Sequence, residues 1–139
     1  MKPSEDVMNR FYQNTGKLFY AVAAADKKVR PEEYEKLAEI IKSDWLPLED
    51  TVDPFDTDAA FQIEFIFDWL EDACVEPYDC FEEFKEFKDT HEYLFTEDVK
   101  QLIWKTAYEI ASAFSKRNKS ELVMLSKLAL LLKEGDPVL

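Results

Sequence analysis

The stretch Ala23-Ala24-Ala25-Asp26-Lys27-Lys28-Val29-Arg30-Pro31-Glu32-Glu33 joins two segments with helical periodicity and decides the fold. Before it, residues 5–25 carry apolar side chains at the three- and four-residue spacing of an amphipathic helix: Val7, Phe11, Leu18, Val22 and Ala25. After it, Pro31 is a residue favoured at the first helical position, and apolar residues again follow at helical spacing: Tyr34, Leu37, Ile40 and Ile41. The stretch therefore predicts the turn of a helix hairpin.

A similar hairpin recurs later in the chain. A shift of 88 residues places Ala25 on Ala113, Lys28 on Lys116, Glu33 on Glu121 and Leu37 on Leu125. Each identity falls at an equivalent point of the helix–turn–helix, which is typical of an internal duplication. We therefore expect two pseudo-repeated hairpins, residues 5–43 and 97–134, on either side of an inserted segment, residues 44–96.

The inserted segment and the second hairpin contribute the remaining helices. Residues 44–56 hold two prolines and five acidic residues, and they predict a loop. Residues 57–73 are apolar nearly all round, which is typical of a central, buried helix, and a further helix is expected from Pro77 to about Tyr93. With helices opening at Thr96 and near Lys119, the chain is predicted to be one all-α domain of about six helices.

Composition agrees with this fold class. A chain of 139 residues can close one core, and 2 Gly and 6 Pro supply too few turns for a sandwich or barrel. The polar N-terminal residues resemble no export signal and no apolar run is long enough to span a bilayer, so we expect a cytoplasmic protein. The spacing of Cys74 and Cys80 matches no common zinc or redox motif, so both are expected to be buried, reduced thiols.

The charge is unevenly distributed. Residues 44–98 hold 19 acidic residues and two lysines, a net charge of −17, whereas the rest of the chain has a net charge of +4 and the whole has −13. A dense negative charge disfavours contact with nucleic acid. The acidic segment is typical of a solvated face, and the alternatives are that it meets a basic protein surface or attracts divalent cations.

The quoted turn resembles the A-x-A-D-G-x-[VI]-x-x-x-E signature of the tellurite-resistance TerB-like domains. The resemblance covers residues 18–42 in motif, with a weaker echo at 106–130, and the family is small, acidic, all-helical and often built from two such hairpins. It implies a role in stress response or phage defence, with Asp26 and Glu33 as metal contacts. Lys27 stands where the family usually has Gly, and Phe114 occupies the Asp position of the second copy.

The same residues also suit helix capping. Glu33 is the third helical residue when Pro31 is the first, so its carboxylate can accept from the Arg30 N–H, and Glu121 is placed likewise after Asn118. Asp26 can satisfy backbone groups in the turn. A second, weaker metal candidate is Asp56-x-Asp58, whose alternation is the one that calcium loops use. The sequence leaves capping and metal binding both open.

No catalytic motif is present, and we expect a protein that is not an enzyme. The chain has one histidine, His91, expected at the surface near a helix end, and it lacks a Gly-rich phosphate loop and a G-x-S-x-G elbow. One alternative function is an acidic immunity protein or inhibitor that neutralises a basic partner, with binding residues Trp45, Glu49, Asp50 and Asp53. Another is an assembly module or homodimer that uses an exposed strip formed by Trp45, Leu46 and Leu48.

Overall fold

The computed structural model describes residues 4–25, 29–47, 59–113 and 119–133. These residues form six α-helices and no strand, which confirms the all-α class. The helices are α1 (Glu5–Ala23), α2 (Pro31–Ile40), α4 (Gln62–Ala73), α5 (Pro77–Thr90), α6 (Glu97–Ser112) and α7 (Lys119–Lys133). No helix of the described ranges is long and apolar enough to cross a membrane.

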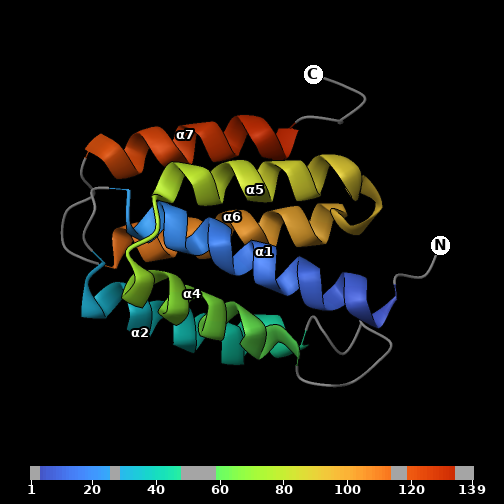
Figure 1. The fold of residues 1–139 in the computed structure, drawn as a ribbon, viewed down its shortest axis with the longest axis horizontal. Coiled ribbons are helices and arrows are strands. Elements are labelled where there is room, and N and C mark those ends of the chain that lie inside the picture. Colours follow the sequence, from blue (N-terminus) through green and yellow to red (C-terminus); the bar gives the residue numbers. More distant parts are fainter. Residues whose placement is uncertain (1–3, 26–28, 48–58, 114–118, 134–139) are drawn as a thin grey trace.

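Helix α1 is the centre of the domain. It packs against α4, α5, α6 and α7, while α2 packs against α6 (Figure 1). From Leu18 to Ala24 every side chain of α1 is at most 4% exposed. Gly16 permits the close approach of α4, because a Cβ atom there would lie 2.8 Å from the carbonyl oxygen of Ile63. Backbone contact at this distance explains why a residue without a side chain stands in the middle of a helix.

Helix α4 is not the buried central helix that its composition predicts. Its inner face, with Ile63, Phe67 and Leu70, lies in the core, but Phe65 is 71% exposed and Trp69 is 63% exposed. The prediction was wrong because α1 already fills the centre, so α4 packs on the outside and only one of its faces meets α1. Apolar composition alone does not tell which face of a helix is covered.

The first hairpin extends further than the sequence indicated. After Ile40 the chain continues as a π-helix, Ile41–Trp45, and stays helical to Pro47, where a loop from Asp44 was predicted. The wider turn directs Trp45 into the core, where its ring contacts Phe11 and Phe19. Its Nε1–H donates to Thr106 Oγ1 at 3.0 Å, which ties the end of the first hairpin to α6. Tertiary packing therefore overrides the loop signal of the prolines and acidic residues.

The two hairpins pack across each other. Helix α2 lies on α6 and α7 lies on α1, so the second helix of each hairpin covers the first helix of the other. Buried positions correspond under the 88-residue shift, as in the pairs Val22 and Ile110, Leu37 and Leu125, and Ile40 and Leu128. The duplication itself remains a prediction. The arrangement nevertheless places the first turns of α2 and α7 at the same end of the molecule (Figure 1).

Candidate functional site

Glu33 caps the start of α2. Pro31 is the first helical residue, and Arg30 precedes it with an extended backbone. The Arg30 N–H donates to Glu33 Oε1 at 2.8 Å, and the Arg30 guanidinium lies 3.9 Å from the same oxygen. This confirms the predicted contact between Glu33 and the Arg30 N–H. Unlike an ordinary capping carboxylate, however, Glu33 is 0% exposed.

The second carboxyl group of the site belongs to the other hairpin. Glu121 lies in the first turn of α7 and is 1% exposed. At the end of the molecule where α2 and α7 both begin, the side chains of Glu33 and Glu121 hydrogen-bond to each other. The sequence marked these residues as equivalent but did not place them in contact. The predicted repeat could have indicated this contact. If two repeats pack about an approximate two-fold axis, residues at equivalent positions, such as Glu33 and Glu121, can meet at that axis.

The hydrogen bond between two buried carboxyl groups requires a proton. An ionised carboxylate is only an acceptor, so one partner must carry a hydrogen for the bond to form. Burial and the hydrogen bond to Glu121 raise the pKa of Glu33 to about 8, although the Arg30 N–H and guanidinium oppose the shift. At neutral pH the pair therefore holds a proton that an exposed glutamate would have lost.

Only one carboxyl oxygen of Glu33, Oε2, is left for the contact with Glu121. Oε1 accepts from the Arg30 N–H, whereas Oε2 is buried and, apart from a proton shared with Glu121, no hydrogen-bond donor of the described part of the chain reaches it. Burial of a carboxylate oxygen without a donor or a cation is costly. A proton shared with Glu121, or a metal ion held between the two carboxylates, would satisfy this oxygen.

Acidic side chains of α4 lie beside the start of α2. A pocket of about 260 Å³ is lined there by Arg30, Tyr34, Asp68 and Glu71, among others. The Tyr34 hydroxyl donates to Glu64 Oε2 at 3.3 Å. Burial and the charge of Glu64 raise the pKa of Tyr34, which keeps the phenol protonated as a donor. This pocket therefore combines the acidic side chains of Asp68 and Glu71 with the guanidinium of Arg30.

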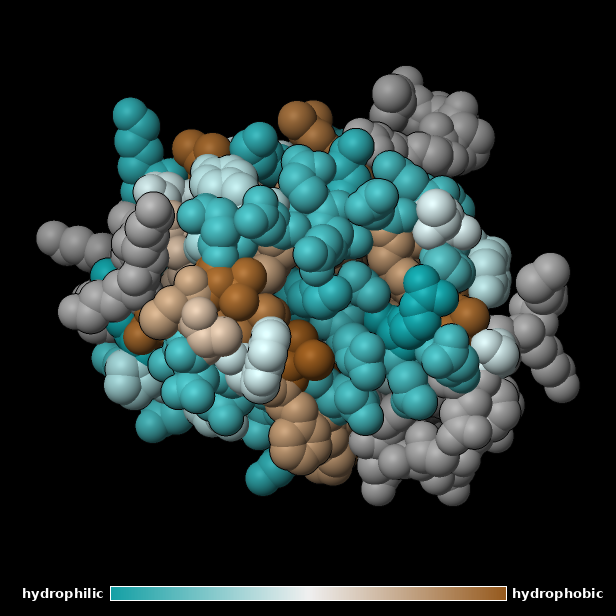
Figure 2. Space-filling view, viewed as in Figure 1, coloured by the Kyte–Doolittle hydropathy of each residue, from teal (hydrophilic) through white to brown (hydrophobic). Residues whose placement is uncertain are grey.

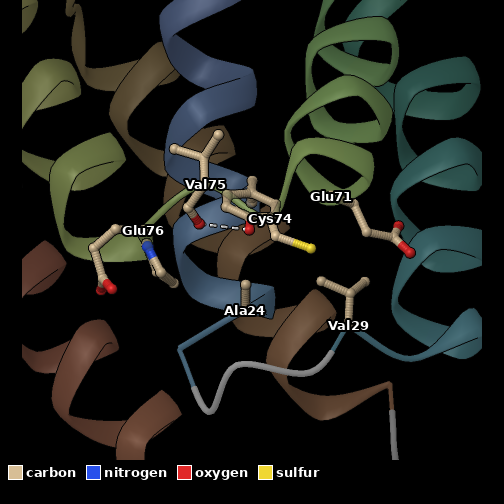
Figure 3. A pocket seen from close by; sticks show the side chains of 8 residues that line it. Ala24, Val29, Glu71, Cys74, Val75 and Glu76 are labelled. Atoms are coloured by element: carbon tan, nitrogen blue, oxygen red, sulfur yellow. Dashed lines mark hydrogen bonds between the residues drawn. The ribbon is translucent and has the colours of Figure 1, made fainter.

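An adjacent pocket of about 280 Å³ lies between the end of α1 and the turn that joins α4 to α5. Figure 3 shows Val29, Glu71 and Cys74 around it, with a hydrogen bond of 2.7 Å from the Tyr20 hydroxyl to the carbonyl of Val75 closing one wall. Cys74 is exposed, so the prediction of two buried thiols was wrong for this residue. It ends α4 in a left-handed conformation, with φ of 55°.

The other cysteine behaves as predicted. Cys80 is a free thiol on the inner face of α5, only 2% exposed. Burial raises its pKa to about 11, so the thiol stays protonated and is a poor nucleophile. His91 ends α5 as expected, with its ring stacked on Phe87 at 4.2 Å between centroids.

Several predicted site residues cannot be placed against this geometry. The proposed metal contacts Asp26, Asp56 and Asp58 lie outside the described residues, as do the partner-binding candidates Glu49, Asp50 and Asp53 and the apolar Leu48. Trp45 is described, and it is 0% exposed. The prediction that Trp45 anchors a partner or forms an exposed strip was wrong, because the π-helical turn buries the indole against α1 and α6.

Comparison of the chain with protein-family models, curated proteins and solved structures returned no match. Among the described residues, no group of three or more His, Cys, Asp and Glu side chains is placed to hold a metal ion.

Proposed function

We propose that this chain is a non-enzymatic TerB-like module, associated with stress or tellurite resistance or with defence, that binds a divalent metal ion at Glu33 and Glu121. One observation supports the metal site most strongly. Glutamates from two separate hairpins meet at 0% and 1% exposure, although each could have capped its helix in contact with water. Carboxylate oxygens are the ligands that hard divalent cations prefer. Asp26, in the turn before α2, is the third ligand of the proposal.

Metal binding at this pair would replace the shared proton. The cation would take the place between Glu33 Oε2 and Glu121, while Glu33 Oε1 continues to accept from the Arg30 N–H. Because ligands must be deprotonated before they bind a metal ion, the affinity should rise with pH up to the pKa of about 8 given for Glu33. Proton release on binding is thus a specific signature of this site.

Thermal denaturation with Mg²⁺, Ca²⁺, Mn²⁺ and Zn²⁺ tests the proposal. A ligand at about 100 times its dissociation constant stabilises the folded state by about 2.7 kcal/mol, which raises the melting temperature of a domain of this size by several degrees. The substitutions Glu33→Gln, Glu121→Gln and Asp26→Asn should each remove the shift. Glu35→Gln removes one charge from an exposed position of the same helix and should leave the shift unchanged.

Two results would contradict the metal site. One is a melting temperature that none of the four ions changes at millimolar concentration. The other is a shift that persists in Glu33→Gln, because the ion would then bind elsewhere on the acidic surface. Calorimetric titration in two buffers of different ionisation enthalpy measures the expected proton release directly.

A second function is favoured by the outer face of α5. The exposed acidic residues Asp79, Glu82, Glu83, Glu86 and Asp89 follow one another along this helix, and Figure 2 shows hydrophilic side chains covering the surface over it. Lys17 pairs with Glu83 at 2.9 Å and Lys85 with Asp89 at 3.8 Å, which leaves most of the negative charge uncompensated. Such a surface suits an inhibitor of a basic protein.

This alternative predicts salt-sensitive binding to a basic partner encoded nearby. Reversing the charges of Glu82, Glu83 and Glu86 should slow association strongly, whereas Glu33→Gln should not affect it. The absence of a gene for a basic toxin beside this one would argue against the alternative.

A further inference from the structure

One face of helix α6 is partly exposed, whereas the corresponding face of α1 is buried. Under the 88-residue shift, Tyr12, Gly16 and Tyr20 of α1 correspond to Lys100, Trp104 and Tyr108 of α6. The three residues of α1 are buried, and α4 and α5 both pack against this helix. Those of α6 are only half-buried or exposed, and Tyr108 reaches 41% exposure. Among the described residues, α4 and α5 thus cover α1, whereas no helix covers the equivalent face of α6.

This open face contains a groove between α6 and α7. The groove has a volume of about 510 Å³, with Trp104, Ala129 and Leu132 among its apolar lining and with Glu97, Lys100 and Lys133 among its charged lining. Trp104 lies against Tyr108, with 6.2 Å between ring centroids, so the aromatic surface continues along α6. Exposed Leu122 lies seven residues before Ala129, on the same side of α7.

The equivalent groove of the first hairpin holds a helix. There α4 lies over α1, with Ile63 and Ile66 against Gly16 and with a hydrogen bond of 3.4 Å between Gln13 and Gln62. Gln13 and Gly16 correspond to Gln101 and Trp104, which both line the open groove. The first hairpin shows that a groove of this type accommodates an amphipathic helix, and no helix of the described ranges lies in the second.

The chain offers a helix face that complements the open groove. On the outer side of α4, Phe65 and Trp69 are 71% and 63% exposed and stand one helical turn apart. The exposed acids Asp68 and Asp72 flank them, opposite in charge to Lys100 and Lys133 of the groove. Large aromatic side chains so exposed are unusual on a surface that stays in water, and they are typical anchors of protein interfaces.

We propose that the α6/α7 groove binds the outer face of α4 from a second copy of this chain. Phe65 and Trp69 pack against Trp104 and Ala129, and Asp68 and Asp72 face the groove lysines. The contact joins two different surfaces, so each molecule provides one helix face and one groove, and the association is head-to-tail. Charge complementarity within the contact overcomes the repulsion between two acidic molecules at ionic strengths that screen distant charges.

Sedimentation velocity between about 10 and 500 µM protein, at about 150 mM salt, tests the proposal. The wild-type chain should self-associate with rising concentration. Trp69→Asp, which removes the α4 anchor, and Ala129→Glu, which fills the groove with a charged side chain, should each weaken association at least about ten-fold. Tyr93→Asp is the matched control, because Tyr93 is 46% exposed but lies outside both surfaces.

Mixing the two variants distinguishes this contact from other dimers. The Trp69→Asp chain retains its groove and the Ala129→Glu chain retains its α4 face, so an equimolar mixture should form a 1:1 complex. Helical circular dichroism and unchanged melting temperatures establish that both variants are folded. A monomeric wild type over the whole range, wild-type association of Trp69→Asp, or a mixture that stays monomeric would each overturn the proposal.

Discussion

Replacing Glu33 by Gln should remove most of the loss of stability that the wild-type chain suffers between about pH 5 and pH 8. Burial and the hydrogen bond to Glu121 raise the pKa of Glu33 from 4.5 to about 8 in the folded chain. In this window the folded state holds a proton that the unfolded chain has released. Stability from the bound proton is therefore complete below pH 4.5 and is lost as the pH rises through about 8.

The size of the effect follows from the shift. One proton bound in the folded state alone changes the free energy of unfolding by about 1.4 kcal/mol per pH unit. Integration between pH 5 and pH 8, with the two pKa values given for Glu33, yields a loss of about 3 kcal/mol. A glutamine keeps the geometry, because its oxygen can accept from the Arg30 N–H while its amide donates to Glu121.

Urea denaturation followed by circular dichroism at several pH values measures this difference. Wild type and Glu33→Gln should have similar stability near pH 5, and the variant should be about 3 kcal/mol more stable near pH 8. Glu35→Gln, on the exposed face of α2, removes the same charge and serves as the control. If Glu33→Gln and wild type lose stability in parallel as the pH rises, the two glutamates do not share a proton and the reasoning fails.

Three further predictions concern the fold. Gly16→Ala should lower stability by about 1–3 kcal/mol, because its Cβ would lie 2.8 Å from the Ile63 carbonyl oxygen; an unchanged melting temperature would show that α1 and α4 are less close. Cys74→Gly should raise stability by about 1 kcal/mol in urea denaturation, because φ is 55° at this helix end, and a loss would mean that the thiol contributes more than the backbone strain costs. Thr106→Val should cost about 1–3 kcal/mol, because the buried Trp45 Nε1–H loses its acceptor, and a double variant with Trp45→Phe should recover part of that loss.

The helix starts could be predicted because their signals are local. Pro31 and Pro77 each occupy the first helical position, and the Thr96 hydroxyl accepts from the Val99 N–H at 3.3 Å, as the sequence indicated. Proline geometry and caps act within one turn, so a short stretch of sequence contains the whole cause. The same holds for the contact between Glu33 and the Arg30 N–H.

Features that depend on packing could not be predicted in this way. Residues 57–73 are apolar enough for burial on all sides, yet Phe65 and Trp69 are exposed because no element of the described part of the chain covers the outside of α4. Trp45 shows the opposite error, because its segment has the composition of a loop and yet its indole is buried in the core. In both cases the deciding partner is α1, which lies far away in sequence.

Capping and cation binding, which the sequence presented as alternatives for Glu33, concern different oxygens: Oε1 makes the cap in the structure, and the proposed cation would use Oε2. Oε1 accepts from the Arg30 N–H and so fixes the side chain at the start of α2, as local chemistry requires. That anchoring leaves Oε2 in the interior, where Glu121 of the second hairpin meets the same carboxyl group. A capping glutamate in one hairpin would have been an ordinary surface feature. Two of them, brought together by the crossing of the hairpins, form a buried pair that must hold a proton or a metal ion, and the cap is what positions it.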